Sequence, residues 1–73
     1  MPRKVREIIA DYRRAGFTII VSGGKGSHRK AIHPLVSGAA TIAGQDGADA
    51  KPYQEAELRD KLKKLAEARK RQP

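Results

Sequence analysis

The sequence predicts a small α+β domain in which the elements follow the order helix, strand, strand, strand, helix. Apolar residues recur at a helical period near both ends of the chain, whereas short β-rich segments separated by glycine and proline fill the middle. With 73 residues the chain has room for one domain, 1–73, and one core. Eleven of the apolar residues are alanine. Because so small a core rarely supplies more than about 3–5 kcal/mol of stability, we expect a stabilising partner.

The first helix is predicted by one apolar stripe and by the residues that flank it. Pro2 suits a helix start, and Gly16 lies where a left-handed C-terminal cap is expected. Phe17, directly after this glycine, is expected to fold back onto the last helical turn. The stripe falls at positions i, i+3, i+4 and i+7 and consists of Val5, Ile8, Ile9 and Tyr12.

Three short strands are predicted between the helices. Residues 17–22 are rich in β-branched side chains and lie between glycines, so they predict the first strand. A short mixed segment, 28–33, predicts the second, and 39–43 predicts a weak third strand. The proline, serine and glycine of 34–38 indicate a turn, and 44–51 reads as a loop.

The last helix is expected to begin at Pro52, a residue that suits the first helical position. Leu58, Leu62 and Leu65 form its apolar stripe. Acidic residues are enriched in its first turns and basic residues toward its end, as the helix dipole favours. The basic end at 66–73 is expected to fray.

Composition excludes several classes of protein. The absence of cysteine excludes disulfides, thiolate nucleophiles and cysteine-rich metal sites. No apolar run approaches the roughly 18 residues that span a bilayer, and no signal-peptide pattern is present, so we expect a cytoplasmic protein. The net charge of +8 points to a polyanion, most simply nucleic acid. Residues 1–34 hold eight basic and two acidic groups, so they carry +6 of that excess.

The segment GGKGSHRK, residues 23–30, is the strongest candidate for chemistry. Its glycines allow backbone amides to approach a phosphate closely, and Lys25, Arg29 and Lys30 add positive charge at the same place. The spacing is not that of a Walker P-loop, because Lys25 is followed by Gly26. The alternative is a flexible hairpin connection that happens to be basic.

His28 is the most specific candidate for a catalytic residue in this segment. It follows Ser27 and lies among cations that favour the neutral imidazole, which is suited to taking a proton from a ribose 2′-hydroxyl. The alternative is a surface histidine hydrogen-bonded to the backbone. His33, before Pro34, is interpreted as part of a turn. Two histidines alone give little support for a metal site.

The motifs "RRAGF", "KGSH", "HP" and "KP…LRDKL", in this order over roughly residues 4–65, resemble the HicA toxin family of small bacterial ribonucleases. The resemblance implies a fold similar to a double-stranded RNA-binding domain, with two helices on one face of a three-stranded antiparallel sheet. It places the active histidine at His28, preceded by Gly26 and Ser27. It also implies cleavage without a metal or other cofactor and inhibition by a HicB-type antitoxin. Gly26 and Ser27 are also RNA-binding candidates, and Lys25, Arg29 and Lys30 are added to them from their charge and proximity.

The leading hypothesis is therefore a toxin that cleaves mRNA by acid–base chemistry at His28. We expect a monomer that forms a hetero-oligomer with its antitoxin. One alternative is a non-catalytic double-stranded RNA-binding module that uses basic residues of the last helix, namely Lys61, Lys63 and Lys64, although these residues also fit a solvated helix surface. Another is an interaction protein that exists mainly in complex with an acidic partner.

Overall fold

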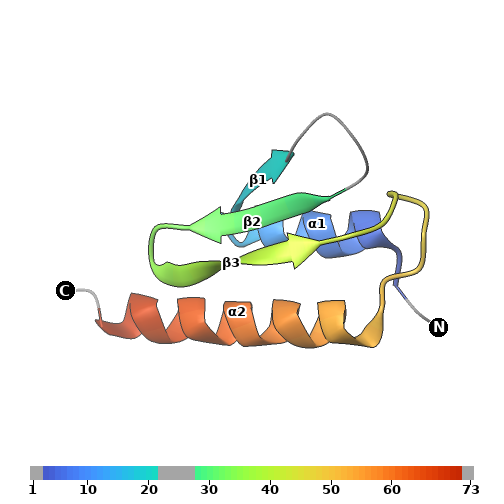
Figure 1. Ribbon diagram of the computed structural model, residues 1–73. Coiled ribbons are helices and arrows are strands. Elements are labelled where there is room, and N and C mark those ends of the chain that lie inside the picture. Colours follow the sequence, from blue (N-terminus) through green and yellow to red (C-terminus); the bar gives the residue numbers. More distant parts are fainter. Residues whose placement is uncertain (1–2, 22–27, 72–73) are drawn as a thin grey trace.

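The computed structural model describes residues 3–21 and 28–71 and confirms the α+β architecture in the expected element order (Figure 1). Two helices accompany a three-stranded antiparallel sheet. The elements, in chain order, are α1 (Val5–Arg14), β1 (Thr18–Val21), β2 (Arg29–His33), β3 (Val36–Ile42) and α2 (Pro52–Arg71).

The central strand of the sheet is β2, which pairs with β1 on one side and with β3 on the other. Arg29, its first residue, lies opposite Val21 of β1 and Ile42 of β3. The register between β2 and β3 shifts between Ala31 and His33. The start of β2 is thus held between two neighbouring strands. His28, the residue just before β2, is therefore attached to a rigid part of the sheet.

The end of α1 closes as the sequence predicts. Gly16 has φ +97, and its N–H donates to the carbonyl of Arg13 at 3.0 Å, while the N–H of Phe17 donates to the carbonyl of Tyr12 at 3.0 Å. This pair of bonds is a Schellman motif, which satisfies helix-end carbonyls. The Phe17 ring then packs edge-on against the Tyr12 ring, with centroids 5.1 Å apart. The turn between α1 and β1 therefore delivers Phe17 into the core.

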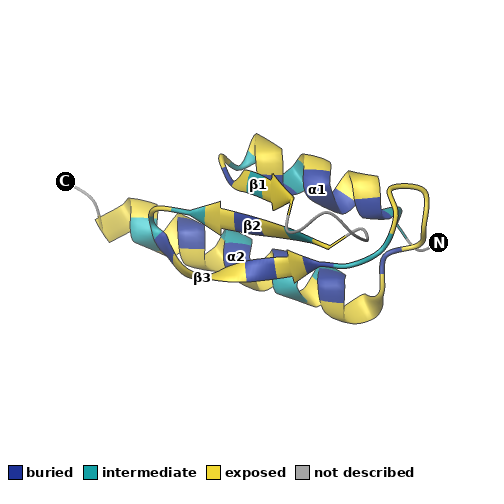
Figure 2. Cartoon of the chain, turned by 45° about the horizontal axis from the view of Figure 1, so that its top comes forward, coloured by how far each residue is buried: buried dark blue, intermediate teal, exposed yellow. Residues whose placement is uncertain are grey.

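Both helices cover one face of the sheet, and the opposite face stays open (Figure 2). Strand residues alternate between the faces, so Ala31 and Ala40 are fully buried while Ile20, Lys30 and Ile32 are exposed. The buried apolar cluster draws on both helices, on β2 and β3, and on the segments that connect the elements: Val5, Ile8, Ile9, Tyr12, Phe17, Ala31, Val36, Ala40, Ile42, Ala50, Leu58 and Leu65.

Two predicted boundaries differ from the structure. The predicted turn at 34–38 is wrong for its second half, because β3 begins at Val36, which is buried. Only Pro34 and Leu35 form the turn. Gly38, which the sequence placed in this turn, lies inside β3, where its φ of +78 is a backbone conformation that favours glycine. Helix α2 also continues through Arg71, well into the 66–73 segment that was expected to fray.

No helix in the described ranges is long and apolar enough to cross a membrane.

Candidate functional site

His28 lies at the start of the central strand. It immediately precedes β2, and it is exposed. Its neighbour Arg29 is paired on both sides within the sheet. His28 is therefore attached to the central strand, which is paired on both sides. A catalytic side chain needs such a rigid attachment, because it has to meet its substrate in a fixed geometry.

The structure does not bring the other predicted site residues together in one site. Lys25, Gly26 and Ser27 lie outside the described residues. Arg29 is half-buried and lines a pocket against α1, whereas Lys30 is exposed and lies opposite Ile20 and Thr41 of the neighbouring strands. Because successive strand residues point to opposite faces, the two cations do not form one patch.

Arg29 is held by the loop that follows β3. Its Nη1 lies 2.6 Å from a carboxylate oxygen of Asp46, and its Nη2 donates to the carbonyl of Gly44 at 3.2 Å. Its Nε is buried and has no acceptor among the described residues. A buried donor left unpaired costs about 1–3 kcal/mol. The loop therefore satisfies this guanidinium only in part.

The loop itself is anchored to the start of α1. The backbone carbonyls of Asp46 and Ala48 accept hydrogen bonds from the N–H groups of Arg6 and Val5, at 3.1 and 2.9 Å. The buried Gln54 side chain donates to the carbonyl of Ala43 at 2.8 Å. The bonds from Val5 and Arg6 satisfy two of the N–H groups that the N-terminus of α1 leaves open. They also fix the position from which Asp46 reaches Arg29.

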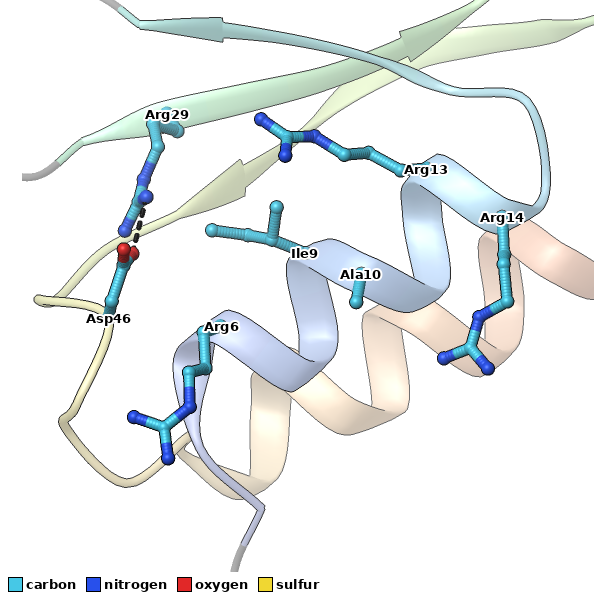
Figure 3. A pocket seen from close by; sticks show the side chains of 7 residues that line it. All are labelled: Arg6, Ile9, Ala10, Arg13, Arg14, Arg29 and Asp46. Carbon is cyan, nitrogen blue, oxygen red and sulfur yellow. Dashed lines mark ion pairs between the residues drawn. The ribbon is translucent and has the colours of Figure 1, made fainter.

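Between α1, the start of β2 and this loop lies an open pocket of about 470 Å³ (Figure 3). Figure 3 shows Arg13 extending from α1 toward the sheet, while Ile9 points into the space between α1 and the Arg29–Asp46 pair. Four arginines and one aspartate are among the residues that line this pocket, and Figure 3 shows the guanidinium groups of Arg6 and Arg14 pointing away from the Arg29–Asp46 pair. Its lining consists of Arg6, Ile9, Ala10, Arg13, Arg14, Arg29 and Asp46.

The four arginines differ in how far their charge is compensated. Arg29 pairs with Asp46, and Arg14 pairs with Asp11 across one turn of α1. Within the part of the chain that the structure describes, neither Arg6 nor Arg13 has a carboxylate partner. The pocket therefore carries a positive field that the protein's own acidic groups do not cancel.

Asp11 also ties the start of the described chain to α1, and this contact predicts a pH dependence. Arg3 lies 2.6 Å from its carboxylate, and the hydrogen bond from Arg3 lowers the pKa of Asp11, with a smaller contribution from Arg14. Because the pKa is lower in the folded state, the stabilisation is present above the unfolded value of about 3.9 and is lost as the pH falls through the folded pKa.

We expect Asp11→Asn to lower the free energy of unfolding at pH 7 by about 0.5–1 kcal/mol, the range of a partly exposed ion pair. Urea unfolding measured from pH 7 to pH 2 should show this difference shrinking below about pH 4. Asp60→Asn is the matched control, since Asp60 pairs with Lys64 at 3.2 Å with both side chains more than half exposed. A constant difference across the pH range would contradict the assignment to Asp11.

The second histidine has the structural role that the sequence predicts. His33 ends β2 and is half-buried. Its Nδ1 accepts a hydrogen bond from the N–H of Leu35 at 3.0 Å, and its ring lies edge-on to Phe17 at 5.1 Å. His33 thus braces the β2–β3 turn and the core, which sets it apart from the exposed His28.

The arginine-lined pocket was not predicted from the sequence. A signal was nevertheless present, because Arg6, Arg13 and Arg14 fall at i, i+7 and i+8 and so share a second helical face beside the apolar stripe. What the sequence pattern does not contain is the packing of the 43–51 loop, which closes the pocket. In the described residues, no group of three or more His, Cys, Asp or Glu side chains is placed to hold a metal ion.

Comparison with known proteins adds no family assignment: no family model matches the chain, and searches of curated proteins and of solved structures find no significant match.

Proposed function

We propose that the chain is a HicA-type toxin, an endoribonuclease that cleaves mRNA at His28 without a metal. The observation that carries this proposal is an exposed histidine at the start of the central strand, one residue away from a pocket lined by four arginines. Acid–base cleavage of RNA needs a group that transfers protons, such as an imidazole, and positive charge nearby that attracts the phosphate. The motifs around His28 that resemble the HicA family point to the same activity.

The proposed reaction starts at the ribose 2′-hydroxyl. His28 takes the hydroxyl proton, and the 2′-oxygen attacks the adjacent phosphorus, so that a P–O2′ bond forms and the P–O5′ bond breaks. A proton from the imidazolium or from solvent completes the leaving 5′-hydroxyl. The product strand ends in a 2′,3′-cyclic phosphate or, after hydrolysis, in a 3′-phosphate. Cationic side chains near His28 offset the charge that develops on the phosphate oxygens.

The open face of the sheet supports an antitoxin partner. Ile20 and Ile32 are 43% and 39% exposed on this face, with Lys30 beside them in β2. Exposed apolar side chains around a cation suit a protein surface that carries both apolar and acidic groups. A HicB-type antitoxin bound to this face would also stabilise a domain whose own core is small.

Chimeric RNA tests the chemistry directly. A single-stranded RNA and the same strand with one 2′-deoxy nucleotide at the scissile position are incubated with the purified protein in the presence of EDTA. We expect cleavage of the all-ribose strand alone, with cyclic or 3′-phosphate ends. Products with 5′-phosphate ends, or equal cleavage of the deoxy-substituted strand, would refute attack by the 2′-hydroxyl.

A non-catalytic binder of double-stranded RNA remains the second candidate, since it uses the same element order. Its expected contacts on α2 are weakened by the structure. Lys61 is buried and donates to the carbonyl of Ser37 at 3.3 Å, so it is neither a solvated surface residue nor an open RNA contact. Lys64 pairs with Asp60. A shift of duplex RNA without degradation of single strands would favour this candidate over the nuclease.

A further inference from the structure

The pocket between α1 and the start of β2 has an anion-binding character, and the proposed cleavage step at His28 does not say which phosphate binds in it. Two of its arginines, Arg6 and Arg13, have no carboxylate partner in the described chain, and a third, Arg29, keeps a buried Nε without an acceptor. Arg13 extends from α1 toward the sheet strand that carries Arg29 (Figure 3), and planar guanidinium groups match the oxygen geometry of a phosphate.

The Asp46 carboxylate occupies part of the position that such an anion would take. It contacts Arg29 at 2.6 Å, yet its own side chain is 64% exposed, so it reaches the pocket from solvent. Only the Asp46 end of this ion pair is exposed, and solvent screens that end, so the carboxylate is a displaceable competitor. The loop backbone that carries Asp46 is held independently by its hydrogen bond from the N–H of Arg6. The side chain can therefore leave Arg29 without unfolding the loop.

We infer that this pocket is a phosphate subsite that grips the RNA backbone beside the cleavage point, and that Asp46 closes it when no RNA is bound. The inference rests on the proposed function for the identity of the ligand. The pocket begins next to His28 along the backbone, because Arg29, which directly follows His28 in the chain, is one of the residues that line it. In this inference the phosphate that flanks the one cleaved at His28 binds at Arg13 and Arg29, which line the pocket from α1 and from β2.

Binding is tested apart from cleavage in the His28→Ala background. A fluorescein-labelled single-stranded RNA is titrated at several salt concentrations with the full chain and with two further variants, Arg13→Gln and Asp46→Asn. Lys64→Gln is the matched control, because it removes one positive charge on α2, away from the pocket.

We expect Arg13→Gln to weaken binding about tenfold, as the loss of one charge-assisted contact does. It should also reduce the slope of log K against log salt by about 0.7, the value for one phosphate on a single strand. Asp46→Asn should tighten binding about threefold, because it removes the competing carboxylate. Lys64→Gln should change affinity by less than about twofold.

Equal effects of Arg13→Gln and Lys64→Gln, or no gain from Asp46→Asn, would overturn the subsite. This failure differs from failure of the proposed nuclease. If the chain with His28 intact cleaves no RNA while the binding differences appear as expected, the phosphate subsite is supported and the catalytic proposal is refuted. If cleavage is intact and the binding differences are absent, only the subsite is refuted.

Discussion

His28→Ala is expected to reduce RNA cleavage by about 10²–10⁴-fold, the usual contribution of a positioned acid–base group. The side chain is exposed and precedes the first residue of β2, so its removal should leave the sheet pairing of Arg29 intact. Initial rates on a labelled single-stranded RNA measure the loss, and circular dichroism checks that the variant is folded. RNA affinity should change far less than the rate, because the guanidinium groups of the pocket remain.

His33→Gln is the natural control for this experiment. It removes the ring that contacts Phe17 and replaces the acceptor for the N–H of Leu35. We expect it to lower the melting temperature while leaving the cleavage rate of the folded protein within about threefold, since this side chain is half-buried at the other end of β2. A variant at His33 that loses cleavage as completely as His28→Ala would show that the two roles have been exchanged.

Phe17→Ala is expected to cause the largest loss of stability, about 3–5 kcal/mol. The ring is buried and packs edge-on against both Tyr12 and His33, with centroids 5.1 Å away in each case. Because a core of this size supplies only about 3–5 kcal/mol in total, the variant should be largely unfolded at 37 °C. Urea unfolding and near-ultraviolet circular dichroism measure the effect.

Phe17→Leu keeps the prediction measurable if the alanine variant does not fold, with an expected loss of about 1–2 kcal/mol. Tyr53→Ala serves as the matched aromatic control. Tyr53 is 55% exposed on α2, so its loss should change the free energy of unfolding by no more than about 0.5 kcal/mol. Similar losses at Phe17 and Tyr53 would contradict the packing described for the α1–β1 turn.

Local sequence signals predicted most of the fold because each depends on neighbouring residues. The α1 stripe and Gly16 identify the helix and its end without any knowledge of the tertiary structure. The start of β3 was missed for the opposite reason. Val36 belongs to the strand because of its pairing with His33 and its burial in the core, and neither is visible in a window that contains proline, serine and glycine.

The candidate site also has a part that the sequence predicts and a part that depends on tertiary packing. His28 stands out in the sequence through its glycine-rich basic context, and the structure adds its exposure at the head of the central strand. The grouping of Arg13 with Arg29 is not predictable from the sequence, because it depends on how α1 crosses the sheet and where the 43–51 loop is anchored. Lys61 was interpreted as an RNA contact or a solvated surface residue, but it is buried and donates to the carbonyl of Ser37 in β3. Its position on a charged helix does not predict this contact with the sheet.

The half-life of bulk mRNA after induction of the chain in a bacterium tests the central claim most directly. The chain and its His28→Ala variant are expressed to equal levels, transcription is stopped, and the decay of total mRNA is followed together with growth. The chain with His28 should arrest growth and shorten the mRNA half-life severalfold, whereas the His28→Ala variant should do neither. Unchanged mRNA decay with the native chain, or equally rapid decay with both proteins, would contradict a ribonuclease centred on His28.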